Sequence, residues 1–172
     1  LGLLLCDFLV EQFLEPGAPL VVAVDGSVFA RSGRKVYGAV WHHDAGAQPG
    51  GRGFRFGNCF VVAGLVVRIP VLGARAWCLP LLFRLWLPTS KPSKECPKPS
   101  KRPSQQQLAA QLVAKLAERY PDRRVEVVAD AAFACKAMAP AEARTTLTSR
   151  LRANAVLQAP KPRGSADVLA KA

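Results

Sequence analysis

The chain has 172 residues, half of them hydrophobic, and its 24 Lys and Arg residues outnumber its 12 Asp and Glu residues to give a formal net charge of +12. This length and composition are typical of one globular domain with a buried core, and they exclude an intrinsically disordered chain. The charge indicates a polyanionic partner, most commonly nucleic acid. A membrane is not indicated, because no stretch forms a basic amphipathic helix and no apolar run approaches the ~18–20 residues of a membrane span.

The cysteines and the chain ends bear on the setting of the protein. Five Cys residues are widely spaced and form no CxxC pair. This argues against a disulfide framework and a zinc site, and it favours a reducing, cytoplasmic environment. The chain begins without Met and ends in a loop-like composition after Pro160. We therefore expect a fragment of a longer protein.

The first half of the chain predicts a short helix followed by strands. Residues 1–15 have near-helical apolar spacing and are followed by a Pro- and Gly-containing break. The apolar run 20–24 predicts a strand buried on both faces, which ends at Asp25. Residues 36–41 predict the next strand, forming a hairpin with the first, and 58–67 predict another buried strand. Residues 76–87 continue as strand, with Pro80 favouring an edge or a bulge.

The second half begins with a change of composition. Residues 88–104 alternate Pro with Lys and Arg, which predicts a disordered basic loop that is either a tolerated insertion or an arm for the DNA backbone. Ser104 and Gln107 form a capping-box pattern for a helix that runs to about Tyr120. A second apolar strand then ends at Asp130, an Ala-rich helix is expected over 131–143, and a last strand over 145–152. Such an order predicts a mixed α/β sheet covered by helices.

Asp25 and Asp130 are the candidate metal ligands. If the two strands that precede them are parallel neighbours, these acids lie at the same edge of the sheet, about 4.8 Å apart from strand to strand. Two carboxylates so close repel each other unless cations neutralise them, and Mg²⁺ or Mn²⁺ suits oxygen ligands. The alternative is structural, because an Asp after a strand is often a turn former or a helix N-cap.

An ordered series of segments resembles bacterial insertion-sequence transposases of the DDE superfamily endonuclease type. The likeness covers roughly residues 19–160 and is carried by 22–27, 32–38, 41–44, 57–64, 79–86, 127–133 and 148–155. The resemblance implies a ribonuclease H-like fold with a mixed five-stranded sheet flanked by helices and interrupted by the basic loop. It also implies an N-terminal helical remnant in 1–18 and a disordered tail in 161–172.

In such a family Asp25 and Asp130 would be the first two catalytic acids, both bound to Mg²⁺ or Mn²⁺. The third acid is expected on a helix after the last strand, where only Asp167 is present in unmatched surroundings. We therefore expect truncation before that acid. The implied partners are DNA, as insertion-sequence ends and target, and a second copy of the protein during synapsis. The alternative is an inactive remnant that binds DNA through charge alone.

Four basic residues are weaker candidates for contacts with the DNA backbone: Lys35, Arg84, Arg150 and Arg152. Ordinary surface charge explains them equally well. His42 and Cys59 could suggest a thiol nucleophile with its base, but a His beside an aromatic strand is more often structural.

Overall fold

The computed structural model describes residues 2–33, 35–43, 53–88, 102–139 and 143–151. Within these ranges the elements are α1 (Gly2–Phe13), β1 (Leu20–Ala30), β2 (Val40–His43), β3 (Phe54–Arg68), the 3₁₀ turn η1 (Pro70–Leu72), β4 (Ala76–Trp86), α2 (Gln105–Arg119), β5 (Val125–Ala129), the 3₁₀ turn η2 (Lys136–Met138) and β6 (Thr145–Ser149). No helix among the described residues is long and apolar enough to cross a bilayer.

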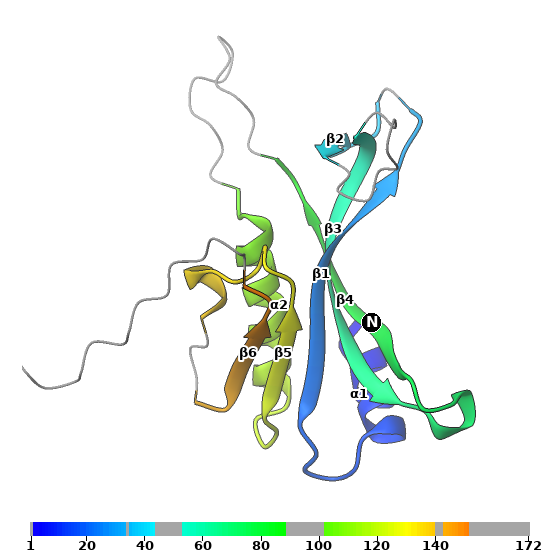
Figure 1. Cartoon of the computed structure of the whole chain (residues 1–172), viewed down its shortest axis with the longest axis vertical. Helices are drawn as coiled ribbons and strands as arrows, with labels where there is room; N and C mark the ends of the chain where they lie inside the picture. The colour runs from blue at the N-terminus through cyan, green and yellow to red at the C-terminus, as the bar shows by residue number, and fades with distance from the viewer. Residues whose placement is uncertain (1, 34, 44–52, 89–101, 140–142, 152–172) are drawn as a thin grey trace, which may run out of the picture.

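The strands form one mixed sheet in the order β2-β3-β1-β5-β6, with β4 also paired to β3 (Figure 1). β1 is antiparallel to β3 and parallel to β5, and β5 is parallel to β6. β2 and β4 share one edge of the 15-residue strand β3 and pair with different parts of it. The expected mixed sheet flanked by helices is confirmed, with β2 as a sixth strand among the described residues.

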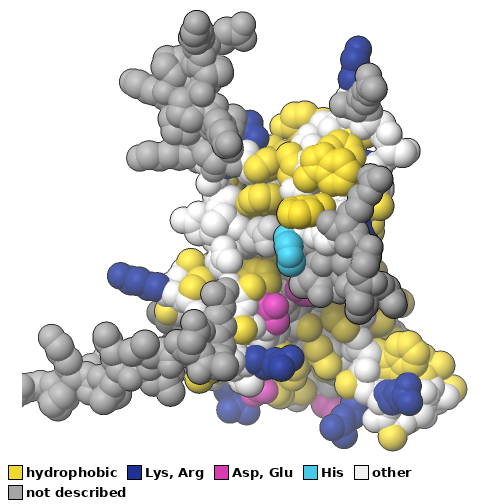
Figure 2. Space-filling model, turned by 45° about the horizontal axis from the view of Figure 1, so that its top comes forward, with side chains coloured by type: hydrophobic (Ala, Val, Ile, Leu, Met, Phe, Trp, Pro, Cys, Tyr) yellow, Lys and Arg dark blue, Asp and Glu magenta, His cyan; other side chains and the backbone are white. Residues whose placement is uncertain are grey.

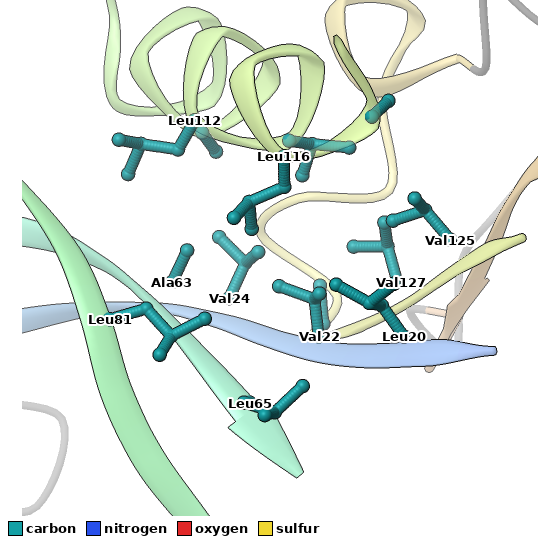
Figure 3. Close-up of a cluster of buried hydrophobic side chains, with 14 of the residues drawn as sticks. Leu20, Val22, Val24, Ala63, Leu65, Leu81, Leu112, Leu116, Val125 and Val127 are labelled. Atoms are coloured by element: carbon teal, nitrogen blue, oxygen red, sulfur yellow. The ribbon is translucent and has the colours of Figure 1, made fainter. Parts of the chain in front are cut away.

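Both helices cover the same face of the sheet. Side chains of α2 point down onto alternate residues of β1, β3 and β5, as Figure 3 shows for Leu112 and Leu116 above Val22 and Val24. α1 adds Cys6 and Val10 to the same buried cluster. Full burial of a Leu or Val side chain stabilises a fold by about 1.5–3 kcal/mol, so this layer holds the domain together.

Local signals set the ends of α2 and its link to α1. The Ser104 hydroxyl accepts from the Gln107 N–H, and the Gln107 side chain accepts from the Ser104 N–H, which completes the expected capping box. At the other end of the helix, Arg119 forms an ion pair with Asp7 of α1 at 2.9 Å, and the Tyr120 hydroxyl donates to the same carboxylate. The two helices are therefore joined by charge as well as by the core.

β1 is longer than its sequence suggests. It pairs with β5 only from Leu20 to Val24, but its antiparallel pairing with β3 continues as far as Ala30. Figure 1 shows β1 turning away from β5 at the tip of β5 and continuing beside β3. Asp25 therefore lies in the middle of a strand, at the point where two strands separate, and not at the end of β1.

Several expected elements are confirmed and two are wrong. The helices in 1–15 and 105–120, the strands at 58–67, 76–87 and 125–129, and a last strand from residue 145 are all present. Pro80 lies on β4 at an irregularity in the pairing with β3, as expected. The hairpin between β1 and the next strand is wrong, because β2 starts at Val40 and pairs with β3. The helix over 131–143 is also wrong, since among its described residues only the 3₁₀ turn η2 is helical.

The expected basic loop falls mainly on residues 89–101, and the expected tail on 161–172; both lie outside the described residues. The boundary proposed at residue 18 stays a prediction.

Candidate functional site

Asp25 and Asp130 each follow the last rung of the parallel β1–β5 pair. The last paired residues are Val24 and Ala129, and each acid is the residue that follows on its strand. The alternation of buried Val22, Val24, Val127 and Ala129 puts both acids on the face of the sheet away from the helices, and both are exposed. Neighbouring strands are about 4.8 Å apart, so the pairing of Val24 with Ala129 brings the main chains of the two acid-bearing segments close together just before the acids.

Three hydrogen bonds fix the backbone around Asp130. Its carboxylate Oδ1 accepts from the Ala132 N–H at 2.8 Å, and its main-chain carbonyl accepts from the Phe133 N–H. The Ser149 hydroxyl of β6 donates to that same carbonyl at 2.7 Å. Asp130 is thus a turn former, as one alternative held, but Oδ2 takes no part in this turn and remains a carboxylate oxygen for a cation.

Asp25 is held more simply. Its Oδ1 accepts from the N–H of Gly26 at 2.7 Å. On the other side of the sheet the buried thiol of Cys59 has its pKa raised, first by burial and then by the negative charge of Asp25. The thiol is therefore kept protonated, which disfavours its use as a nucleophile. His42 is engaged elsewhere, because its Nε2 contacts the carbonyl of Gly57 at 3.1 Å.

The first turn of α2 links the two acid-bearing segments, which the sequence did not reveal. Gln105 Nε2 donates to Cys59 Sγ at 3.4 Å, and a Cβ at Gly26 would lie only 3.2 Å from Gln105 Oε1. Gln106 Nε2 donates to the carbonyl of Ala132, in the turn that Asp130 begins, at 3.0 Å. Consecutive glutamines thus contact the residue after Asp25 and the turn after Asp130. These two glutamines have no recognisable sequence pattern, unlike the capping box that Ser104 and Gln107 form around them.

The chemistry of this site suits a hard divalent cation. Two exposed carboxylates on adjacent strands offer the oxygen ligands that Mg²⁺ and Mn²⁺ prefer, and their exposure leaves room for water and phosphate. In the part of the chain that the structure describes, no third acid, His or Cys completes a cluster with them. Asp167 lies outside the described residues.

The three basic candidates that the structure describes lie in different parts of the molecule. Lys35 and Arg150 are exposed, and Arg150 follows β6 next to Ser149, whose hydroxyl binds Asp130. Arg84 is opposite Val61, a residue buried under the helices, so it lies on the face of the sheet away from Asp25. Arg152 lies outside the described residues.

Comparison with known proteins gives one match. The family model described as DDE superfamily endonuclease matches residues 3–168, which is nearly the whole chain. Searches of curated proteins and of solved structures find no match. The sheet is mixed, with β1 and β5 as parallel neighbours in its middle and helices on one face. This architecture is consistent with the ribonuclease H-like domain of such enzymes. The chain belongs to the DDE superfamily endonuclease family.

Proposed function

We propose that this chain is the catalytic domain of an insertion-sequence DNA transposase and that Asp25 and Asp130 are two ligands of its divalent metal ions. The observation that carries the proposal is the register of β1 and β5, in which the two acids directly follow the paired residues Val24 and Ala129. The substrates are the DNA ends of the element and its target. A second copy of the protein is the expected partner when two ends are brought together.

The residues of the chain have separate tasks in this proposal. Asp25 and Asp130 hold the cation, and when bound it lowers the pKa of water and neutralises the charge of the phosphodiester. Ser149 and Gln106 keep the turn after Asp130 in place through the carbonyls of Asp130 and Ala132. The excess of positive charge on the chain supplies affinity for the phosphate backbone of DNA of any sequence.

A second candidate function is DNA binding without catalysis. It is favoured by the absence, among the described residues, of a third acid near the pair. Such a protein would bind duplex DNA through its net charge of +12 and would lose affinity steeply as the salt concentration rises. The two candidates differ in whether a metal ion binds at Asp25 and Asp130.

The test combines a DNA assay with a direct metal measurement. Supercoiled DNA is incubated with the chain and Mg²⁺ or Mn²⁺, and Mn²⁺ binding is measured by calorimetry. We expect metal-dependent nicking and Mn²⁺ binding that Asp25→Asn and Asp130→Asn each abolish. Asp122→Asn is the matched control, since Asp122 is an exposed acid before β5, at its opposite end. Mn²⁺ binding without nicking supports the metal site alone. Unchanged Mn²⁺ binding in both site variants refutes the assignment.

A further inference from the structure

An aromatic pocket opens on the sheet face that carries Asp25. It is lined by Phe29, Arg31, Phe60 and Phe83, from β1, β3 and β4 and the residue after β1, and its volume is about 240 Å³. Phe29 and Phe60 meet edge to face, with ring centroids 5.5 Å apart. Phe29 is 46% and Phe83 52% exposed, which is unusual for phenylalanine.

The pocket is in line with the candidate metal site. Asp25 pairs with Val62, and Val62 pairs with Phe83, so an acid and an aromatic ring share one row across three strands. Two residues further along β1, Ser27 pairs with Phe60. By strand geometry the pocket begins about 7–10 Å from Asp25, which corresponds to about two or three nucleotides at ~3.4 Å each along a stacked DNA strand. Figure 2 shows one group of hydrophobic side chains on the upper part of the molecule, with a histidine and acidic side chains below it, and further hydrophobic side chains at the lower right.

The guanidinium of Arg31, at the edge of the pocket, is held in a fixed orientation by hydrogen bonds. Arg31 Nε donates to the Oδ1 of Asn58 at 3.1 Å, and Asn58 Nδ2 donates to the carbonyl of Tyr37 at 2.9 Å. Asn58 is only 5% exposed, so it provides a rigid anchor. A guanidinium beside aromatic rings suits a ligand that has a planar, polar ring attached to a phosphate. The guanidinium can stack on the ring of the ligand or form an ion pair with its phosphate.

We propose that this aromatic pocket stacks one unpaired nucleobase of the DNA strand whose phosphate lies at Asp25 and Asp130. The proposal rests on the proposed function, which supplies the DNA strand. The volume is below the ~300 Å³ typical of pockets for drug-sized ligands and suits a single ring system. Base stacking on exposed aromatics is how proteins hold single strands without reading sequence. A second copy of the chain is the poorer occupant, because two molecules of net charge +12 repel each other where no DNA lies between them to neutralise the charge.

The experiment measures binding of a labelled single-stranded oligothymidine and of a duplex of equal length to the full chain, by fluorescence anisotropy without metal. We expect Phe29→Ala and Phe83→Ala each to raise the Kd for the single strand roughly 5- to 150-fold, which corresponds to one lost base stack. The Kd for the duplex should stay the same, and urea unfolding checks that the variants are folded. Phe83→Trp should restore single-strand binding. Phe8→Ala is the control, since Phe8 is 56% exposed on α1, across the sheet from the pocket.

Each other outcome is decisive. Unchanged single-strand affinity in both alanine variants overturns the inference, as does an equal loss for duplex and single strand. If the wild-type chain is a dimer in light scattering and the alanine variants are monomers with unchanged DNA affinity, the pocket is an interface between copies and the inference is wrong. Mn²⁺ binding is followed in parallel. If the wild-type chain does not bind Mn²⁺ but the alanine variants still weaken single-strand binding and not duplex binding, the metal site is refuted and the nucleobase pocket is supported.

Discussion

Replacing Gln106 by Ala tests whether α2 positions the candidate metal site. The change removes the 3.0 Å hydrogen bond from Gln106 Nε2 to the carbonyl of Ala132, whose N–H binds the carboxylate of Asp130. One partly solvated hydrogen bond is worth about 0.5–1.5 kcal/mol, so we expect the free energy of unfolding to fall by that amount. Loss of a hydrogen bond made directly to a metal ligand typically weakens metal binding about 10- to 100-fold. Gln106 acts through Ala132, so we expect a weaker affinity for Mn²⁺ with a loss that does not exceed this range.

Gln107→Ala is the matched control in the same helical turn. It removes the hydrogen bond from the Ser104 N–H to the Gln107 side chain, which is one half of the capping box, and should cost a similar ~0.5–1.5 kcal/mol of stability. It makes no contact with the turn that Asp130 begins, so the affinity for Mn²⁺ should not change. Urea unfolding gives the stability of both variants and calorimetry gives their Mn²⁺ affinities. If Gln106→Ala and Gln107→Ala lower the affinity equally, or if neither does, then Gln106 does not position Asp130.

Two further predictions concern the framework around the site. The Arg119 guanidinium, helped by the Tyr120 hydroxyl, lowers the pKa of Asp7. The ionised carboxylate therefore stabilises the fold at any pH above its unfolded pKa of about 3.9. This stabilisation is lost as the pH falls through the lower pKa of the folded state. Asp7→Asn should therefore be less stable than the wild type at pH 7, and the gap in urea midpoint should shrink below about pH 4; a gap that is constant with pH would contradict the ion pair. Gly57→Ala should cost about 1–3 kcal/mol or more, because its Cβ would collide with the main-chain carbonyl of Phe29. A loss below about 0.5 kcal/mol in the same assay would show that the β1–β3 pair can yield there.

The parts of the fold that were predicted correctly carry local signals. The capping box at Ser104 starts α2, and the run of Val residues before Asp130 marks β5. The parallel pairing of β1 and β5 was expected from two similar apolar runs that each meet an acid. These features depend on nearby residues, and burial by the helices reinforces them.

The parts that were missed depend on partners far away in the sequence. The residues after Asp25 include Gly26 and Ser27, which favour a turn, yet they continue β1 because β3 pairs with them. The Ala-rich stretch after Asp130 favours a helix by propensity. The structure instead buries Phe133 and Met138 in the core, and so short a helix gains little by itself.

The assignment of Asp25 and Asp130 as metal ligands stays a prediction. That both acids follow the last rung of one parallel strand pair could be expected from two strands that are visible in the sequence. The contacts of Gln105 and Gln106 could not, since a glutamine in a first helical turn has no distinctive pattern. The aromatic pocket also has no sequence signal, because Phe29 and Phe83 become neighbours only through the register with β3.

Because β5 is short, we expect the candidate metal site at Asp25 and Asp130 to open on heating before the whole domain unfolds. β5 and β6 have five residues each, and the two acids follow the last rung that joins β1 to β5. Fraying of that rung would separate Asp25 from Asp130 while the long β1–β3 ladder stays intact, and such local opening needs less free energy than global unfolding. Amide protons near Ala129 should then exchange faster than those near Ala63 in β3. We therefore expect binding of Mn²⁺ at the proposed site to be lost at a temperature at which the circular dichroism is still native.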